Sequence, residues 1–211
     1  MELQIRTAQA SDKGPVAELM YSSGTHIYDY LYGARAVEFL RHEFTSGRGF
    51  AGHPFVTVAV LDEIVVATGC FYDRDSYGER TQGSVKNMLH HFGVLRSVPI
   101  MARARHLSSV MRRPKPGELY LSNFGVSPAL RSQGIGSKLI AHKLSEARSV
   151  GYQAVWPGRV CRESTWGSPV SAPGAGGDEA KALFGPPCRG ARRAQDGACA
   201  VARHRERGCR G

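Results

Sequence analysis

The chain has 211 residues, 42% of them hydrophobic, so it is long enough for one domain with a sizeable core. Its net charge is +10, but half of that excess lies after Trp156, where ten Arg or Lys face five Asp or Glu. No basic face with interleaved aromatic residues is visible, which argues against a nucleic-acid partner. The apolar stretches are too short to cross a bilayer and residues 1–4 lack the pattern of a secretory signal, so we expect a cytoplasmic protein without membrane contact.

The first third of the chain predicts a strand, two helices and a hairpin. Leu3–Arg6 is the strand, Ser11–Asp12 begins the first helix, and Ile27–Phe44 carries apolar residues at roughly helical spacing. Phe55–Val60 and Ile64–Phe71 are rich in β-branched residues and flank a three-residue turn, which is typical of a β-hairpin.

The segment from about Asp73 to Pro116 predicts an inserted pair of helices. Val85–His91 and Ile100–Met111 have helical patterns, and polar, Gly and Pro residues interrupt them. Such an insert between strands either shapes a substrate pocket or packs over one face of the sheet, and the sequence leaves both readings open.

A strand followed by a long helix comes next. Glu118–Val126 predicts the strand, the helix is expected over Arg131–Val150, and Tyr152–Val155 begins another strand. Because alternate residues of a regular strand share a face, one face should carry five side chains: Glu118, Tyr120, Ser122, Phe124 and Val126.

The turn that joins this strand to the helix, Val126–Ser137, has the properties of an anion site. It contains Gly134 and Gly136 immediately before the predicted helix. The first N–H groups of a helix are unpaired and lie at the positive end of its dipole, so a diphosphate can bind there through main-chain groups alone.

Within this turn, Val126-x-Pro128-x-x-Arg131-x-Gln133-Gly134-Ile135-Gly136-x-x-Leu139 resembles the acetyl-CoA-binding signature of the GNAT superfamily of N-acetyltransferases. The resemblance covers about residues 3–155 and implies an α/β (α+β) fold with a mixed central sheet flanked by helices. A P-loop would need Gly-Lys-Ser/Thr, which Gly136-Ser137-Lys138 reverses, and a dinucleotide fingerprint would need a third glycine.

The resemblance also implies how acetyl-CoA would bind. Main-chain N–H groups of Gln133–Ser137 would hold the pyrophosphate, Arg131 would begin the loop, and the end of the preceding strand would pair with the pantetheine arm. The cofactor-binding residues expected on this basis are Phe124, Val126, Arg131, Ser132, Gln133, Gly134, Ile135, Gly136 and Ser137.

The expected reaction is acetyl transfer to an unidentified small-molecule or peptide amine, by direct attack in a ternary complex. An ammonium must lose a proton before it can attack, so a base or a water relay is needed. In several GNAT members a carboxylate on this strand is the base. Tyr120 lies six residues before Val126, where some relatives hold that glutamate, and Glu118 lies two residues further back on the same face, so these two residues are the catalytic candidates. The alternative for Glu118 is an ordinary carboxylate at the start of a strand. The backbone N–H of Val126 would stabilise the developing oxyanion.

Two other functions stay open on the sequence alone. One is a non-catalytic acyl-CoA-binding protein of the same fold, and the other is a basic nucleic-acid-associated protein. The sequence does not decide between a monomer and a homodimer.

Residues 156–211 differ sharply from the predicted domain, residues 1–155. They are rich in Gly, Ala, Arg and Pro and hold four of the five cysteines, namely Cys161, Cys188, Cys199 and Cys209, without a Cys-x-x-Cys pair, so no metal site is expected. The family's Asn-x-x-Ala-x-x-Leu-Tyr pattern has only a distant match at Gly177–Phe184, which lacks the Asn and the Tyr. We interpret this irregular tail as disordered, and as frameshifted or otherwise degenerate coding sequence; a genuine basic tail that binds an anionic partner is the alternative.

Overall fold

The computed structural model describes residues 2–110, 113–152, 154–157 and 170–171. The chain divides into two units, residues 1–176 and 177–211, and every described residue belongs to the first. Apart from residues 156–157 and 170–171, the tail that we interpret as degenerate lies outside the described residues, and so does the partial match at Gly177–Phe184.

A six-stranded mixed sheet forms the centre of the first unit. Its strands are β1 (Leu3–Thr7), β2 (Val56–Leu61), β3 (Ile64–Tyr72), β4 (Glu118–Val126), β5 (Ala154–Pro157) and β6 (Val170–Ser171), and they follow one another in that order. Only β4 and β5 run parallel; all other neighbours are antiparallel. The predicted strands and the mixed sheet are confirmed.

The boundary expected at residue 155 falls inside β5. Trp156 and Pro157 pair with Tyr120 and Leu121, and β6 adds two further residues of the expected tail to the sheet. These residues form strands because neighbouring strands of the sheet supply hydrogen-bond partners for their backbone groups. Their local composition does not predict a strand.

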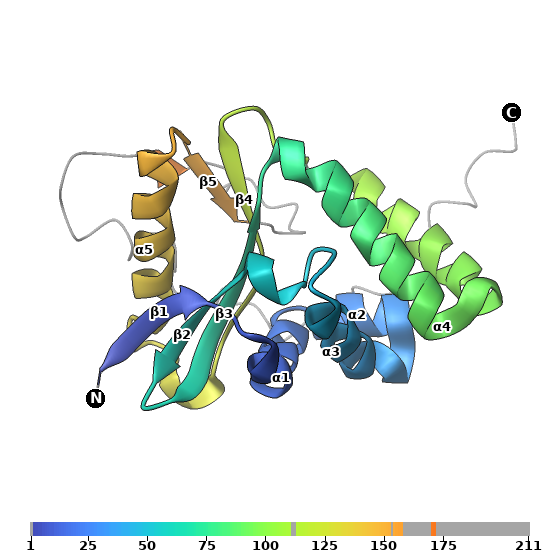
Figure 1. The fold of residues 1–211 in the computed structure, drawn as a ribbon, viewed down its shortest axis with the longest axis horizontal. Coiled ribbons are helices and arrows are strands. Elements are labelled where there is room, and N and C mark those ends of the chain that lie inside the picture. Colours follow the sequence, from blue (N-terminus) through green and yellow to red (C-terminus); the bar gives the residue numbers. More distant parts are fainter. Residues whose placement is uncertain (1, 111–112, 153, 158–169, 172–211) are drawn as a thin grey trace, which may run out of the picture. The chain divides into compact units, whose positions relative to one another are not determined.

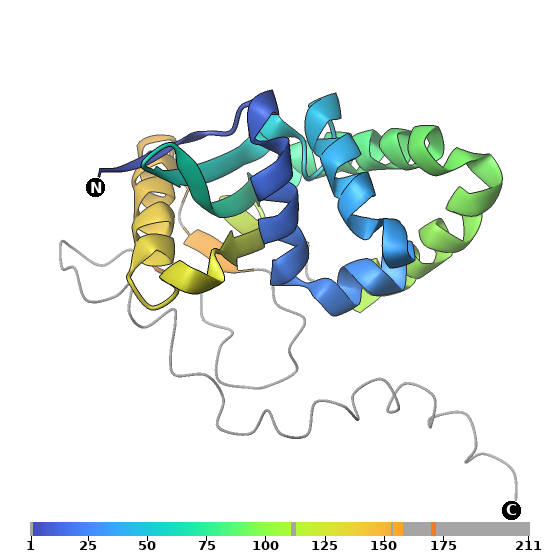
Figure 2. The ribbon, with the colours of Figure 1, turned by 90° about the horizontal axis from the view of Figure 1, so that it is seen from below.

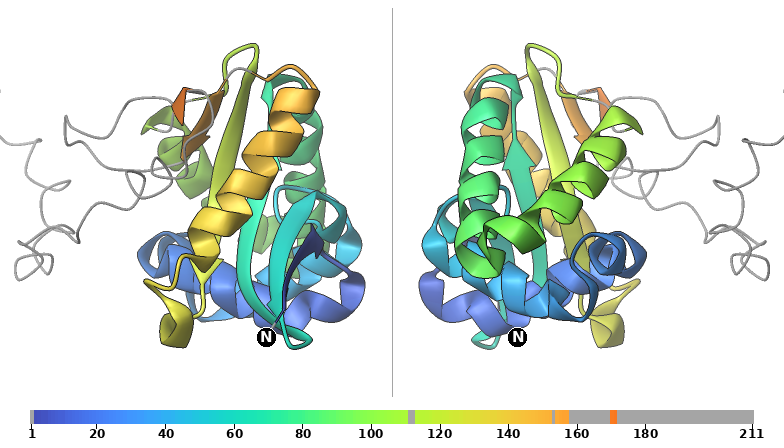
Figure 3. Two further views of the ribbon diagram at one scale, coloured as in Figure 1. Left: turned by 90° about the vertical axis from the view of Figure 1, so that its left-hand side faces the viewer. Right: turned by 90° about the vertical axis from the view of Figure 1, so that its right-hand side faces the viewer.

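Helices cover both faces of this sheet. They are α1 (Lys13–Ser23), α2 (Thr25–Tyr32), α3 (Ala36–Ser46), α4 (Arg74–Val110) and α5 (Ile135–Ser149). The first four lie on one face and α5 covers the other (Figures 1 and 3). In the described part of the chain, no helix is both long and apolar enough to cross a membrane.

The single helix expected over Ile27–Phe44 is wrong: two helices, α2 and α3, occupy this range. Gly33 separates them with φ 61° and ψ −145°, a conformation that only glycine adopts readily. The apolar spacing continues across the break because both helices bury their apolar side chains on the same core.

The predicted helical insert is confirmed. It is α4, in which Gly93 (φ 74°) interrupts the helical backbone and makes a kink between two helices. Both halves lie beside α2 and α3 (Figure 2). They bury a cluster that comprises Phe39, Met88, Phe92 and Ile100.

Candidate functional site

A β-bulge interrupts β4 at Asn123. Ser122 pairs with Cys70 and Gly125 with Thr68, so two residues of β4, Asn123 and Phe124, oppose the single residue Gly69. Asn123 takes up the extra residue in the left-handed region (φ 51°), which Asn tolerates better than most side chains.

The bulge reverses the alternation of side chains along β4. The expectation that Phe124 and Val126 share a face with Tyr120 is therefore wrong: both contact Gly136 of α5, on the opposite face. Asn123 and Gly125 instead face α1 and α2, where Gly125 approaches Leu19 and Asn123 meets Tyr28. Regular alternation cannot reveal such a reversal, because one inserted residue moves everything after it to the other face.

The second half of β4 has an open edge in the described part of the chain. Pairing with β5 ends at Leu121, opposite Pro157. The N–H of Ser127 donates to the Val66 carbonyl on the β3 side, over 2.8 Å. Successive residues of a strand direct their backbone groups to opposite edges, so the N–H and carbonyl of Val126 point to the open edge. Consistent with this, Arg131 Nε donates to the Val126 carbonyl over 3.3 Å.

Beside this edge lies the start of α5. Ser132 (φ 65°) and Gly134 (φ 77°) turn the chain, and the first helical bond runs from the N–H of Lys138 to the carbonyl of Gly134. Among the described residues, none of the N–H groups of Gln133–Ser137 donates to another backbone group. They therefore form a cradle of unpaired donors at the positive end of the helix dipole.

Gly136 allows this cradle to approach β4 closely. A Cβ atom there would lie 2.9 Å from Phe124 Cζ and 3.2 Å from Val126 Cγ2. The cradle and the open edge are thus adjacent, and the group that fits them is one with phosphates at one end and an extended, amide-containing arm, as in coenzyme A. The residues expected for the cofactor, Phe124 to Ser137, all belong to this arrangement.

On the other face of the sheet, a polar cluster surrounds the bulge. The Tyr28 hydroxyl donates to Asn123 Oδ1 over 2.7 Å, and Asn123 Nδ2 contacts Cys70 Sγ at 3.6 Å. Burial raises the pKa of the Cys70 thiol to about 12, so this sulfur stays neutral near pH 7.

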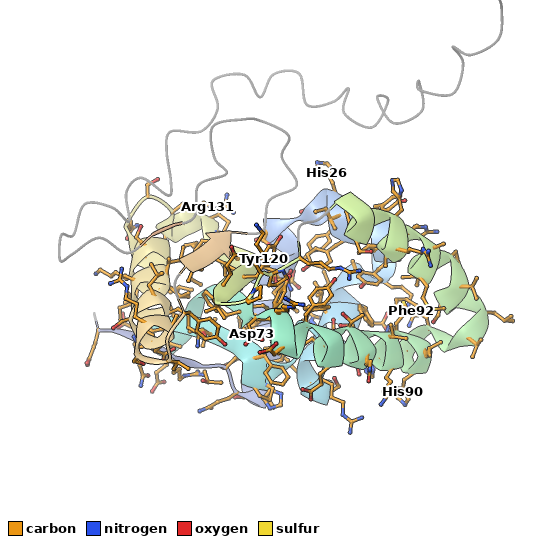
Figure 4. All side chains as sticks on the ribbon, turned by 90° about the horizontal axis from the view of Figure 1, so that it is seen from above. His26, Asp73, His90, Phe92, Tyr120 and Arg131 are labelled. Atoms are coloured by element: carbon orange, nitrogen blue, oxygen red, sulfur yellow. The ribbon has the colours of Figure 1, made fainter. Side chains whose placement is uncertain are left out.

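The two catalytic candidates lie nearer the start of β4 than the cradle does. Tyr120 is buried, and its ring centroid lies 5.2 Å from that of Tyr72; Figure 4 labels its position. Glu118 is half-buried, and its Oε2 accepts the N–H of Lys115 over 3.1 Å. Glu118 and Val126 are eight positions apart in β4, which corresponds to at most about 26 Å of extended strand, so only a group well along the arm from the cradle could reach Glu118.

Sequence reasoning missed Glu43, which the structure buries completely on α3. Its carboxyl accepts a hydrogen bond from Ser84 of α4, and burial raises the pKa of Glu43 to about 7. The available signal was a carboxylate between Leu40 and Phe44, two residues of the apolar stripe of α3.

Comparison with known proteins agrees with this geometry. The family model described as the acetyltransferase (GNAT) family matches residues 25–160. Two solved structures show the same fold. A crystal structure of an acetyltransferase is 18% identical, with a TM-score of 0.56, over 72% of this chain and 78% of that one. An N-acetyltransferase from Staphylococcus aureus Mu50 is 14% identical, with a TM-score of 0.51, over 68% of this chain and 75% of that one.

A comparison with curated proteins found no match. The family model nevertheless covers more than half of the sequence, and the residues expected to bind the cofactor lie within the range it matches. The chain belongs to the GNAT family of acetyltransferases, and its co-substrate is acetyl-CoA.

Proposed function

We propose that this protein is an N-acetyltransferase that transfers the acetyl group of acetyl-CoA to an amine by direct attack within a ternary complex. The observation that carries the proposal is the open edge of β4 beside the unpaired N–H groups of Gln133–Ser137. A cytoplasmic setting, where acetyl-CoA is available, fits this activity.

In this proposal the cradle holds the pyrophosphate and Arg131 adds a positive charge at its rim. The arm of acetyl-CoA pairs with the open edge through the N–H and carbonyl of Val126. For the carbonyl to pair, Arg131 must release it, and the guanidinium then becomes available to a phosphate. An arm that runs along this edge from the cradle leads toward Ser122 and Tyr120.

The chemistry requires a neutral amine. Its nitrogen lone pair forms the new C–N bond at the thioester carbonyl carbon, the C–S bond breaks, and the electron pair leaves with the sulfur of coenzyme A. The proton lost by the amine passes through water to Glu118, with Tyr120 beside the path. Direct attack is favoured over an acetylated cysteine because the one cysteine among the described residues, Cys70, is buried and neutral.

Calorimetry with acetyl-CoA, followed by thiol release with a panel of amines, tests the proposal. We expect micromolar binding, turnover with some amines, and intersecting lines in two-substrate kinetics. Parallel lines would contradict direct attack. Binding without turnover would favour a non-catalytic acyl-CoA-binding protein, and salt-dependent binding to random DNA without affinity for acetyl-CoA would favour the nucleic-acid alternative.

A further inference from the structure

Arg80 is a buried cation that has no carboxylate partner in the part of the chain that the structure describes. It lies on the first half of α4 and is only 9% exposed. Its guanidinium carbon lies 3.9 Å from the centroid of the Phe55 ring, yet Nε and Nη1 are buried and have no hydrogen-bond partner among the described residues. Burial lowers the pKa of Arg80, but a guanidinium remains charged at any physiological pH.

The carboxylates near Arg80 are used elsewhere. Asp73 accepts hydrogen bonds from Ser76 and Tyr152, and Glu43 accepts one from Ser84. Glu79 is exposed and adjacent in sequence, and neighbouring residues of a helix point in different directions. Leaving the Nε and Nη1 donors of a buried cation without acceptors is costly, and an external anion that accepts from them would remove that cost.

Two further hydroxyl groups are buried on the face of the sheet that α1 covers. Thr68 Oγ1 has no hydrogen-bond partner among the described residues, and Ser122 Oγ lies within reach of the Tyr72 hydroxyl. Thr68 lies two residues before Cys70, on the same face of β3, and Ser122 pairs with Cys70. The ring that Arg80 covers belongs to Phe55, and the next residue, Val56, pairs with Cys70, so the cation and both hydroxyls lie in one region around Cys70.

We propose that Arg80 binds a carboxylate of the acceptor, and that the substrates of this enzyme are therefore amines that also carry a carboxylate, such as amino acids or the ends of peptides. Arg80 supplies a pair of parallel N–H donors, and Thr68 and Ser122 supply hydroxyls that orient the rest of the acceptor. The inference rests on the proposed function, because it assigns the acceptor to the face of β4 opposite α5.

The test uses the full chain saturated with coenzyme A or acetyl-CoA. The probes are leucine, methionine, phenylalanine and 5-aminopentanoate, each compared with its carboxamide, which keeps the amine and removes the charge. We expect kcat/KM to favour the carboxylates by about tenfold to a hundredfold. Arg80→Gln should reduce that ratio to about one, with acetyl-CoA affinity unchanged. Arg96→Gln is the matched control, because Arg96 is exposed on the second half of α4.

Binding is measured in parallel with turnover, by calorimetry and by the ¹⁵N resonance of the Arg80 side chain. Carboxylate probes should shift that resonance and carboxamides should not. Equal turnover of both sets, or a preference that survives in Arg80→Gln, overturns the carboxylate site and leaves acetyl transfer intact. If no amine is acetylated, the proposed function fails, and the binding measurements then decide the fate of the site. Carboxylate binding that is lost in Arg80→Gln supports the site, and no carboxylate binding in the wild type overturns it.

A second variant covers the case in which Arg80→Gln fails to fold. Arg80→Lys keeps the charge and loses the parallel N–H donors, so it should still lower the ratio of kcat/KM between carboxylates and carboxamides.

Discussion

The hydroxyl of Tyr28 on α2 donates a hydrogen bond to Oδ1 of Asn123, the residue that forms the bulge of β4, over 2.7 Å. The two residues are 95 positions apart in the sequence. This hydrogen bond connects α2 to the bulge, where the side chains of β4 change faces. It also gives the amide oxygen of Asn123 a donor in the interior of the domain.

Removing the hydroxyl of Tyr28 should therefore destabilise the protein. Tyr28→Phe leaves Asn123 Oδ1 without its donor, and we expect the free energy of unfolding to fall by about 1–2 kcal/mol in urea denaturation. Tyr30→Phe is the matched control, because Tyr30 is 48% exposed on the same helix and should change stability little. Equal effects of the two variants would show that the hydrogen bond contributes nothing.

Gly136→Ala should weaken acetyl-CoA binding. The new methyl group lies 2.9 Å from Phe124 Cζ, so the ring or the start of α5 must move away from the open edge of β4. We expect the dissociation constant for acetyl-CoA to rise about tenfold by calorimetry, which corresponds to about 1.4 kcal/mol. Gly78→Ala, on a part of α4 with nothing within 4 Å, is the control and should leave affinity unchanged. An unaltered affinity in Gly136→Ala would place the pyrophosphate elsewhere.

Glu118→Gln separates a catalytic role of this residue from a structural one. Glutamine keeps an oxygen that can accept the N–H of Lys115, but it cannot take a proton. If Glu118 is the base, kcat/KM should fall by about 10²–10⁴ and the rise of activity with pH should change shape, while the melting temperature stays near wild type. Wild-type rates in this variant would remove Glu118 from the mechanism and leave Tyr120→Phe as the next variant to measure.

The buried carboxyl of Glu43 should make stability depend on pH. Its pKa rises from the ordinary 4.5 to about 7 in the folded protein, chiefly through burial. The folded state then holds a proton that the unfolded state loses, so this contribution to stability is complete below pH 4.5 and is lost as the pH rises through about 7. The total is about 3 kcal/mol.

Urea denaturation between pH 4.5 and 8 measures this dependence. Glu43→Gln, which carries no charge, should flatten the decline, whereas Glu38→Gln, at an exposed position of the same helix, should leave it in place. A decline that persists unchanged in Glu43→Gln would assign it to another group.

Much of the fold follows from local patterns. The strands near Leu3 and Glu118, the hairpin and the helical insert are all found close to their predicted bounds, because apolar periodicity and β-branched composition act over a few residues. The cradle was predictable for the same reason: the glycines, proline and arginine that shape it are contiguous in the chain, and its donors are main-chain groups.

Local sequence patterns were thus enough to predict the family, its co-substrate, and the strand, turn and helix at which we propose that acetyl-CoA binds. Which side chains meet in the interior depends on the packing of distant segments: Asn123 meets Tyr28, Glu43 meets Ser84, and Arg80 has no carboxylate partner among the described residues. These relationships join residues far apart in the chain, and one extra residue in β4 moves Phe124 and Val126 to the face of α5. Such contacts cannot be predicted from the spacing of residues along the sequence, because they depend on how the helices and the sheet pack against one another.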